Sequence, residues 1–362
     1  MIRPFRFGDF FLIHGLSRQA TKLNASLALS QPYSVLGAAL TALIPWNDAK
    51  VVTYVLHQRT HELARSGFLQ AQKRPGRPES DILLLAPALD TTRGHPAIWE
   101  KLLSHYINEA TQQQIARIYA DVPDQPLVVN TLMHVGFRVY TRQTIWRLPA
   151  HGAESFAHQL TANIRVQQKK DNWGLRRLYT QVTPPVVQQA EGLQVGNDLE
   201  PPILDWWQPF VRSSYVLEER GEIYGCIRIG YGIRGIWLQL WSHPDQGNTE
   251  HLHQLVGFAL TEVRRQHNLR LPIYVGVRDY HGGVGSVLAD YGFVPFTDRA
   301  KMTKHLLHWV KVTEPFITPV LEAVPEAIAT PFRLTEGGED STTINGVPPG
   351  QSLSGHHLPG SA

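Results

Sequence analysis

The chain has 362 residues, 43% of them apolar and 18% charged, with a formal net charge of +3. This length suits two domains better than one compact core, and the apolar fraction excludes a wholly disordered chain. The basic residues are spread thinly instead of forming a tract, which argues against a dedicated nucleic-acid surface. The single cysteine, Cys226, excludes an intrachain disulfide and a cysteine-based metal site, and it fits a reducing, cytoplasmic setting.

The N-terminal region offers no targeting or membrane-spanning pattern. The stretch MIRPFRFGDFF carries charges within its first ten residues and lacks an apolar segment followed by small residues, so we expect no signal peptide. The most apolar stretch, 23–46, is interrupted by polar residues and a proline, and its cleaner part is too short to cross a bilayer. We expect packed helix there.

Short strand-like runs open each half of the chain, IRPF at 2–5 and LRRL at 175–178.

Two longer segments each predict a pair of strands joined by a Gly-rich or Pro-rich turn and ended by proline. They read GFLQAQKRPGRPESDILLLAP at 67–87 and YGCIRIGYGIRGIWLQLWSHP at 224–244. Each runs into a segment whose apolar residues recur at helical spacing. These residues are Ile98, Leu102, Leu103 and Tyr106 in the first segment, and Leu252, Leu255, Val256 and Leu260 in the second.

A sequence repeat closes each half. The stretch LMHVGFRVYTRQ (132–143) aligns without a gap with LADYGFVPFTDR (288–299), which pairs Gly136 with Gly292 and Phe137 with Phe293. Each copy predicts a helix closed by a left-handed glycine and followed by a strand that starts on a buried phenylalanine. A β-rich run precedes each copy, at 115–122 and 273–280. The chain therefore contains an internal duplication.

The duplication gives both halves the order strand, helices, strand meander, helix, strand, helix, strand. It predicts an N-terminal domain at 1–148, a polar linker at 149–172 and a C-terminal domain at 173–312. The segment 323–362 is rich in Pro, Gly, Ser and Thr, so we expect a disordered tail there. The fold class is α/β, of the α+β type, in which each half is a mixed, mostly antiparallel twisted sheet flanked by helices.

This element order and the repeated Gly-Phe joint resemble the GNAT superfamily of acyl-CoA-dependent N-acyltransferases, here as a tandem pair at about 1–148 and 173–312. The resemblance implies that the strand before the central helix of each half splays from its neighbour, and that the pantetheine arm of acetyl-CoA or another acyl-CoA lies in the gap. It also implies a pyrophosphate loop similar to R/Q-x-x-G-x-G/A, where glycines allow a close backbone approach and helix N-terminal amides bind phosphate.

Both copies depart from that loop pattern. In the first copy Arg93 and Gly94 are followed by Pro96 where the first glycine belongs, and proline equally suits the first turn of an ordinary helix. In the second copy a carboxylate, Glu250, lies in the first helical turn, where it competes with phosphate. The candidate cofactor contacts are Leu240, Ser242, Gln246, Gly247, Asn248 and Thr249 in the second copy, with Arg93 and Gly94 in the first.

The catalytic groups are less defined. In similar proteins a tyrosine four residues before the Gly-Phe glycine often protonates the leaving thiolate, but Leu132 and Leu288 occupy those positions. Tyr280 and Tyr291 are neighbouring candidates, and both equally suit packed aromatic residues. Glu222 is a candidate base in a glutamate-rich hairpin that is otherwise typical of a solvated turn. The histidines show no HExxH order, so we predict no metal.

The sequence thus favours an acyl-CoA-dependent N-acyltransferase that acts on a small-molecule or peptide amine, without nucleic-acid or membrane partners, and whose site lies in the second copy. Two other functions stay open. The degenerate loops favour a catalytically inactive GNAT-like binding or structural module. A tandem transferase that uses aminoacyl-tRNA would need a basic groove, for which the sequence shows no concentrated charge. The acceptor, the acyl group and the oligomeric state are left undetermined.

Overall fold

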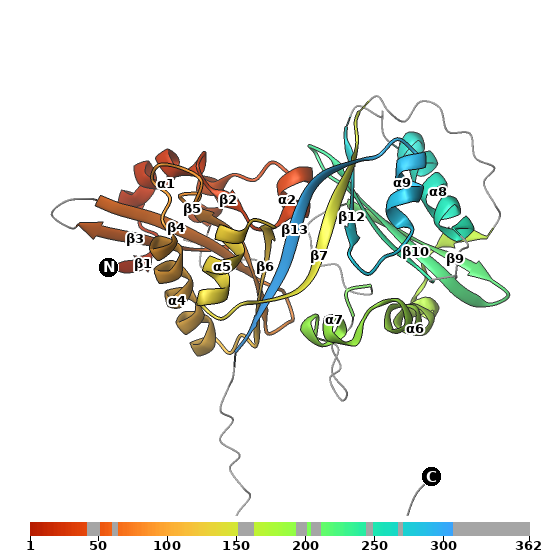
Figure 1. The fold of residues 1–362 in the computed structure, drawn as a ribbon, viewed down its shortest axis with the longest axis horizontal. Coiled ribbons are helices and arrows are strands. Elements are labelled where there is room, and N and C mark those ends of the chain that lie inside the picture. The colour runs from red at the N-terminus through yellow and green to blue at the C-terminus, as the bar shows by residue number, and fades with distance from the viewer. Residues whose placement is uncertain are drawn as a thin grey trace, which may run out of the picture. The chain divides into compact units, whose positions relative to one another are not determined.

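The computed structural model describes residues 1–41, 51–59, 64–150, 163–192, 201–203, 211–243, 249–266 and 271–306. All of them belong to one compact unit, Met1–Val310. The described strands form one 13-stranded sheet flanked by helices (Figure 1). Neighbouring strands are antiparallel except for two parallel pairs, β5 with β6 and β11 with β12. The predicted α/β class with a mixed, mostly antiparallel sheet is confirmed.

The first half contains six strands that continue the sheet and one short strand that branches from it. Its elements are β1 (Ile2–Pro4), η1 (Phe7–Asp9), α1 (Phe10–Ser17), β2 (Thr21–Lys22), α2 (Ala25–Ser30), α3 (Val35–Thr41), β3 (Val51–Arg59), β4 (Ala64–Lys73), β5 (Glu79–Ala86), α4 (Pro96–Gln112), β6 (Arg117–Pro123), α5 (Pro126–His134) and β7 (Arg138–Leu148).

Among the described residues, the second half repeats this order without the branching strand and with two α-helices instead of three before its strand meander. Its elements are β8 (Ile164–Val166), η2 (Lys169–Asp171), α6 (Asn172–Val182), α7 (Pro185–Ala190), β9 (Val211–Glu219), β10 (Glu222–Tyr231), β11 (Ile236–Ser242), α8 (Glu250–Gln266), β12 (Ile273–Arg278), α9 (Val284–Asp290) and β13 (Val294–His305).

The repeated Gly-Phe joint has the predicted structure in both copies. Gly136 follows α5 with a φ of 89° and Gly292 follows α9 with a φ of 77°, and these left-handed conformations suit glycine because it has no Cβ. Phe137 and Phe293 are buried directly before the first residues of β7 and β13. The same physical signal therefore ends a helix and begins a strand twice.

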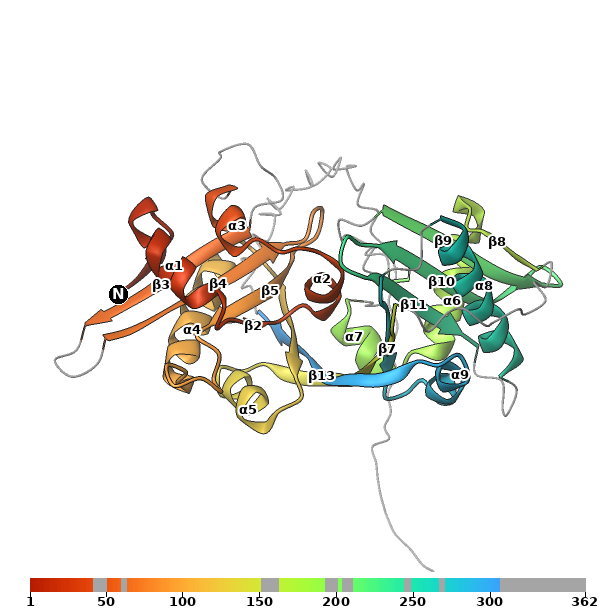
Figure 2. The ribbon, with the colours of Figure 1, turned by 90° about the horizontal axis from the view of Figure 1, so that it is seen from above.

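The two halves exchange their last strands. Strand β13, from the second half, lies between β6 and β7, and β7, from the first half, pairs with β12. Figures 1 and 2 show β7 and β13 running side by side through the middle of the sheet. Each half's sheet is therefore completed by a strand of the other half, a feature that the sequence analysis did not contain. The boundaries 1–148 and 173–312 stay a prediction.

Two local predictions differ from the structure. Residues 175–178 were expected to be strand-like but lie in α6, whose buried Leu175 and Leu178 are spaced for one helix face. The strand that corresponds to β1 is instead β8, which pairs with β9 and lies inside the expected linker 149–172. The tail 323–362 lies outside the described residues.

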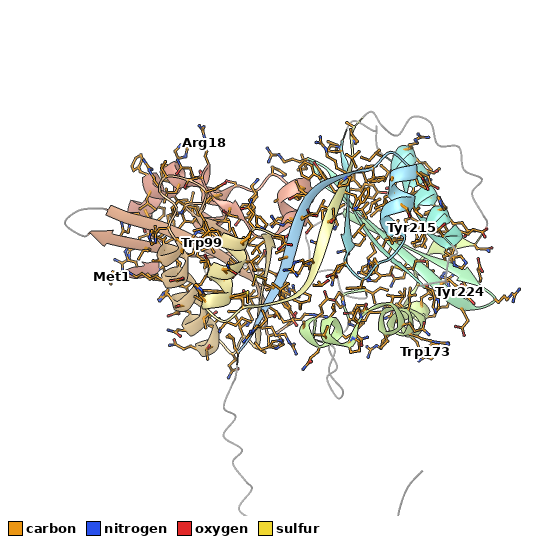
Figure 3. The ribbon with its side chains drawn as sticks, in the orientation of Figure 1. Met1, Arg18, Trp99, Trp173, Tyr215 and Tyr224 are labelled. Atoms are coloured by element: carbon orange, nitrogen blue, oxygen red, sulfur yellow. The ribbon has the colours of Figure 1, made fainter. Side chains whose placement is uncertain are left out.

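Helices cover both faces of the sheet. Helices α4 and α5 pack on one face of the first half, and α1 and α3 pack on the other (Figure 2). Trp99 of α4 is fully buried in the first of these cores (Figure 3). In the second half α8 and α9 cover one face and α6 the other. Helix α2, although it belongs to the first half, packs on Trp237 and Tyr274 of the second half.

Candidate functional site

The sheet opens at one place in each half. Strands β11 and β12 pair only through Ile236–Ile273, Trp237–Tyr274 and Leu238–Val275, although β11 continues to Ser242. Strands β5 and β6 likewise pair only at residues 79–81 of β5. The splayed strands that the resemblance implied are therefore present in both halves, each before the N-terminus of a long helix.

In the first half the chain itself fills this opening. Strand β2 pairs with β5 at Leu84 and Leu85, beyond the point where β6 departs. Next to it, the Leu23 amide donates to the Leu83 carbonyl at 2.7 Å, and the Leu23 carbonyl accepts from the Asp121 amide at 3.0 Å. Residues 21–23 thus bridge the two splayed strands, in the gap where the resemblance implied the pantetheine arm.

In the second half, no strand among the described residues pairs with this edge of β11 beyond Leu238. The Ile236 amide donates to Pro272 O towards β12 at 2.9 Å, and the His243 amide donates to Tyr224 O towards β10 at 2.8 Å. Because backbone groups of a strand alternate between its two edges, even-numbered residues of β11 face the opening. Leu240 and Ser242, both predicted cofactor contacts, therefore turn their amide and carbonyl groups towards it.

Of the remaining cofactor candidates of the second copy, the structure describes only Thr249. Thr249 directly precedes the helix, and its carbonyl accepts the His253 amide at 3.0 Å. Gln246, Gly247 and Asn248 lie outside the described residues. Their assignment to a pyrophosphate loop stays a prediction.

The corresponding loop of the first copy is closed by its own contacts. The Gly94 amide donates to Thr91 O at 2.9 Å, and a Cβ at Gly94 would lie 2.7 Å from Leu89 Cα, so this glycine serves the packing of its own loop. At the N-terminus of α4, His95 Nδ1 accepts the Ala97 amide at 3.2 Å. Arg93 is exposed beside it. A helix terminus capped by its own side chain has fewer free amides for phosphate.

A polar cavity of about 160 Å³ touches both openings. Both halves contribute to its wall, which includes Asp81, Tyr119 and Asp121 from the first half and Leu240, Gly276 and Arg278 from the second. Leu240 is thus both a residue of the splayed edge and part of this wall. Gly276 lies close to its neighbours, because a Cβ there would be 3.1 Å from Gln143 Oε1 and 3.3 Å from Trp237 Cζ2.

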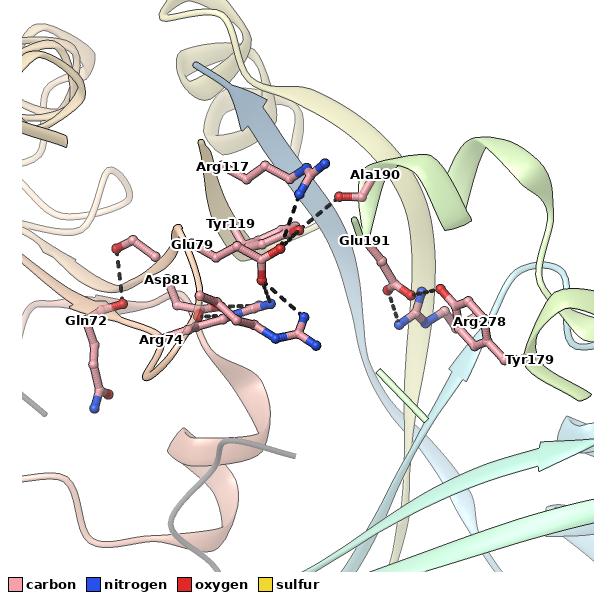
Figure 4. Close-up of polar contacts among 12 residues, drawn as sticks. Gln72, Arg74, Glu79, Asp81, Arg117, Tyr119, Tyr179, Ala190, Glu191 and Arg278 are labelled. Atoms are coloured by element: carbon pink, nitrogen blue, oxygen red, sulfur yellow. Dashed lines mark hydrogen bonds and ion pairs between the residues drawn. The ribbon is translucent and has the colours of Figure 1, made fainter. Parts of the chain in front are cut away.

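The first-half wall carries a buried ionic network (Figure 4). Arg74 binds Asp81 with two hydrogen bonds, of 2.6 and 2.9 Å, and reaches Glu79 at 2.8 Å. Arg117 and Tyr119 also contact Glu79, which has no exposed surface. Because buried carboxylates are costly unless they are paired, this network accounts for both acidic side chains structurally.

The second-half wall holds a second paired carboxylate. Arg278 Nη2 lies 2.6 Å from Glu191 Oε1, and the Tyr179 hydroxyl donates to Glu191 Oε2 at 2.7 Å (Figure 4). Burial raises the pKa of Glu191, but the Arg278 charge and the Tyr179 hydrogen bond outweigh it and leave the pKa below its usual value. Glu191 is therefore ionised and both of its oxygens are occupied.

A third pair lies on the exchanged strand. Arg299 Nε binds Asp121 Oδ1 at 3.1 Å, and the Ala25 amide donates to Asp121 Oδ2 at 3.2 Å. Burial raises the pKa of Asp121, but the charges of Arg299 and Lys301 lower it by more. Lys301 itself lines the cavity, and burial lowers the pKa of its ammonium group.

His281, which the sequence analysis missed, lines the cavity beside the predicted candidate Tyr280. Burial lowers the pKa of His281 to about 4, and its Nε2 has no hydrogen-bond partner among the described residues. The Tyr280 ring meets it edge to face, with centroids 4.5 Å apart, and burial raises the Tyr280 pKa. A histidine directly after the tyrosine that ends the predicted β-rich run 273–280 was the available signal, but 17 histidines made it unspecific.

None of the three predicted catalytic candidates, Tyr280, Tyr291 and Glu222, is among the residues that line the cavity, although Tyr280 adjoins His281, which does line it. Glu222 starts β10 with its side chain 54% exposed and binds Arg177 at 2.9 Å, which is the arrangement of a solvated turn. Tyr291 is 1% exposed, and its hydroxyl donates to the His253 carbonyl at 2.9 Å. Their roles in catalysis stay untested, while their contacts account for both residues structurally.

Within the described ranges, no cluster of three or more His, Cys, Asp or Glu side chains is arranged to hold a metal ion. No helix in this part of the chain has both the length and the apolar character needed to cross a membrane.

No family model and no curated protein matches the sequence. Among solved structures, a tandem GNAT protein from the clavulanic acid biosynthesis pathway is similar at 14% identity and a TM-score of 0.48, over 84% of this chain and 98% of that one. A GCN5-related N-acetyltransferase from Sphaerobacter thermophilus is similar at 11% identity and a TM-score of 0.49, over 84% and 95%. At these values we base function on this chain's own residues.

Proposed function

We propose that the protein is an acyl-CoA-dependent N-acyltransferase whose cosubstrate lies along β11 in the second half. The observation that carries this proposal is the end of β11–β12 pairing after Leu238, which leaves Leu240 and Ser242 facing an opening at the edge of the cavity. An extended amide-bearing arm, as in pantetheine, can pair with such an edge as an added strand does.

In the proposed reaction the acceptor amine attacks the thioester carbonyl from the cavity. A nitrogen–carbon bond forms, the carbon–sulfur bond breaks, the amine loses a proton, and the CoA thiolate gains one. His281 supports the first proton transfer, because its lowered pKa keeps it neutral at pH 7 and its Nε2 is unpartnered among the described residues. Tyr280 supports the second, because its raised pKa keeps the hydroxyl protonated.

The first half then acts as wall and scaffold. Its own opening is occupied by β2, and its loop at Gly94 is closed by internal contacts. It still supplies Asp81, Tyr119 and Asp121 to the cavity. The inactive-module alternative thus applies to this half, whereas the second half keeps an open strand edge.

The direct test is calorimetric titration of acetyl-CoA and CoA into the full chain, repeated with Leu240→Pro. Proline removes one amide N–H, and at residue 240 this amide faces the opening and not the β10 ladder. We expect micromolar binding to the unaltered protein and a loss of at least about tenfold in the variant, the equivalent of one hydrogen bond to a ligand.

The matched control is Leu238→Pro, whose amide faces β12 within the paired part of β11. This variant should lose stability, because it removes a ladder hydrogen bond, and circular dichroism would detect the lower melting temperature. Absence of heat with both ligands, on folded unaltered protein, would refute the proposed cosubstrate site. Equal affinity of the Leu240→Pro variant would exclude this strand edge.

A further inference from the structure

The cavity has buried hydrogen-bond donors that lack protein acceptors. Arg278 Nη1 and Trp237 Nε1 both belong to lining residues, are shielded from solvent, and have no partner among the described residues. A buried donor that makes no hydrogen bond costs about 1–3 kcal/mol of stability. Such groups therefore usually have an acceptor in the functional state. These two donors come from neighbouring strands, β12 and β11.

The carboxylates of the same wall cannot serve as those acceptors, because each is already paired. Asp81 is held by Arg74, Asp121 by Arg299, and Glu191 by Arg278 through its other nitrogen. Lys301 also lines the cavity, where burial lowers the pKa of its ammonium group while the charges of Asp121 and Glu191 act to raise it. The lining therefore has buried donors without an acceptor, while its acidic groups are paired.

We propose that this cavity binds the carboxylate group of the acceptor, so that the acylated amine is a small amino acid or a related amino-carboxylate. The inference rests on the proposed function for the amine chemistry, but it predicts carboxylate binding without acyl-CoA. The carboxylate accepts hydrogen bonds from Arg278 Nη1 and Trp237 Nε1. A planar guanidinium is a favourable partner for a carboxylate.

A monoanion fits this wall better than a phosphate group. Three carboxylates line the cavity together with four cationic side chains, Arg74, Arg77, Arg278 and Lys301, so the charge surplus is small. A doubly charged group would meet the field of Asp81, Asp121 and Glu191. The volume of about 160 Å³ is several times the ~30 Å³ of a liquid water and suits a small organic molecule.

The test compares matched ligands on the full chain in the absence of acyl-CoA. The probes are N-acetylglycine against N-acetylglycinamide, and N-acetylalanine against its amide, each titrated by calorimetry at one ionic strength. These are the products of acetyl transfer and their neutral analogues. We expect each carboxylate to bind at least about tenfold more tightly than its amide, the value of one charge-assisted hydrogen bond.

Variants locate the effect. Trp237→Phe keeps an aromatic ring and removes only the N–H, and we expect it to reduce the carboxylate preference several-fold. Trp146→Phe is the matched control, because Trp146 lies on β7 outside the cavity lining, and it should keep the preference.

Equal binding of acid and amide, or no binding of either pair by folded protein, would overturn the inference. A preference that survives Trp237→Phe unchanged would also overturn it. Failure of the proposed function looks different, since acetyl-CoA would then not bind while the carboxylate preference would still be present.

Discussion

The Leu23 carbonyl accepts a hydrogen bond of 3.0 Å from the Asp121 amide, which ties the segment after β2 to the splayed strand β6. Since the Leu23 amide also bonds to Leu83 of β5, the first opening is bridged on both sides. We therefore predict one acetyl-CoA bound per chain, although the chain contains two copies of the fold.

Calorimetric stoichiometry measures this directly on the full chain. In the Leu240→Pro variant this single site should bind at least about tenfold more weakly, with no second, unaffected site appearing in the titration. Two equivalents of acetyl-CoA bound per chain would show that the ligand displaces residues 21–23 from the first opening.

The exchanged strand gives a prediction on stability. Met302 lies on β13, yet its fully buried side chain belongs to the core of the first half. Met302→Ala should lower the free energy of unfolding by about 2–5 kcal/mol, as other large-to-small core changes do. Urea denaturation would measure the loss.

The control is Met133→Ala on α5, where the methionine is 43% exposed. We expect a change within about 0.5 kcal/mol there. Similar losses in both variants would argue against the placement of β13 in the first-half core.

A duplicated ion pair predicts part of the acid unfolding. Arg165 holds both oxygens of Asp171 at 2.8 Å, and Arg3 holds Asp9 in the same way at 2.6 and 2.8 Å. The Arg165 hydrogen bonds lower the pKa of Asp171 below its ordinary 3.8. The resulting stability is present above pH 4 and is lost as the pH falls through the lower folded value.

Asp171→Asn should therefore be less stable than the unaltered protein at pH 6, and the difference should shrink as the pH falls below about 4. Urea midpoints at a series of pH values would measure both. A difference that does not depend on pH would exclude the charge of Asp171 as its source.

His281 predicts a second pH effect. Burial lowers its pKa from 6.5 to about 4 in the folded protein, so between these values the unfolded chain binds a proton that the folded chain does not. Folding stability should fall as the pH drops from 6.5 towards 4. His281→Gln should remove this contribution.

Nuclear magnetic resonance titration of the imidazole protons provides the measurement, with His281→Gln used to assign the signal. We expect a midpoint near 4. A midpoint at or above 6.5 would contradict the buried, neutral state that the proposed proton transfer requires.

Part of the site was within reach of the sequence. Leu240 and Ser242 were predicted because a strand followed by a loop and a helix is a local pattern; both lie at the free edge of β11, and their contact with a cofactor stays a prediction. The duplicated ion pair, Arg3–Asp9 and Arg165–Asp171, was missed. Its residues recur with the same spacing in the sequence, since Ile2, Arg3 and Asp9 correspond to Ile164, Arg165 and Asp171. This match was overlooked because residues 175–178, and not 164–166, were taken to correspond to the first strand of the chain. His281 and the donors of Arg278 and Trp237 were missed because their importance depends on what surrounds them.

The sequence by itself determined the α/β class, the duplication, and the helix ends at Gly136 and Gly292, because these depend on periodicity and on the local conformation of glycine. The tertiary structure alone decided that β7 and β13 change places, that residues 21–23 close the first opening, and that the second half keeps a free edge. Strand pairing joins residues far apart in the chain, as Leu23 and Asp121 show, and no local pattern records which distant segment will fill a gap.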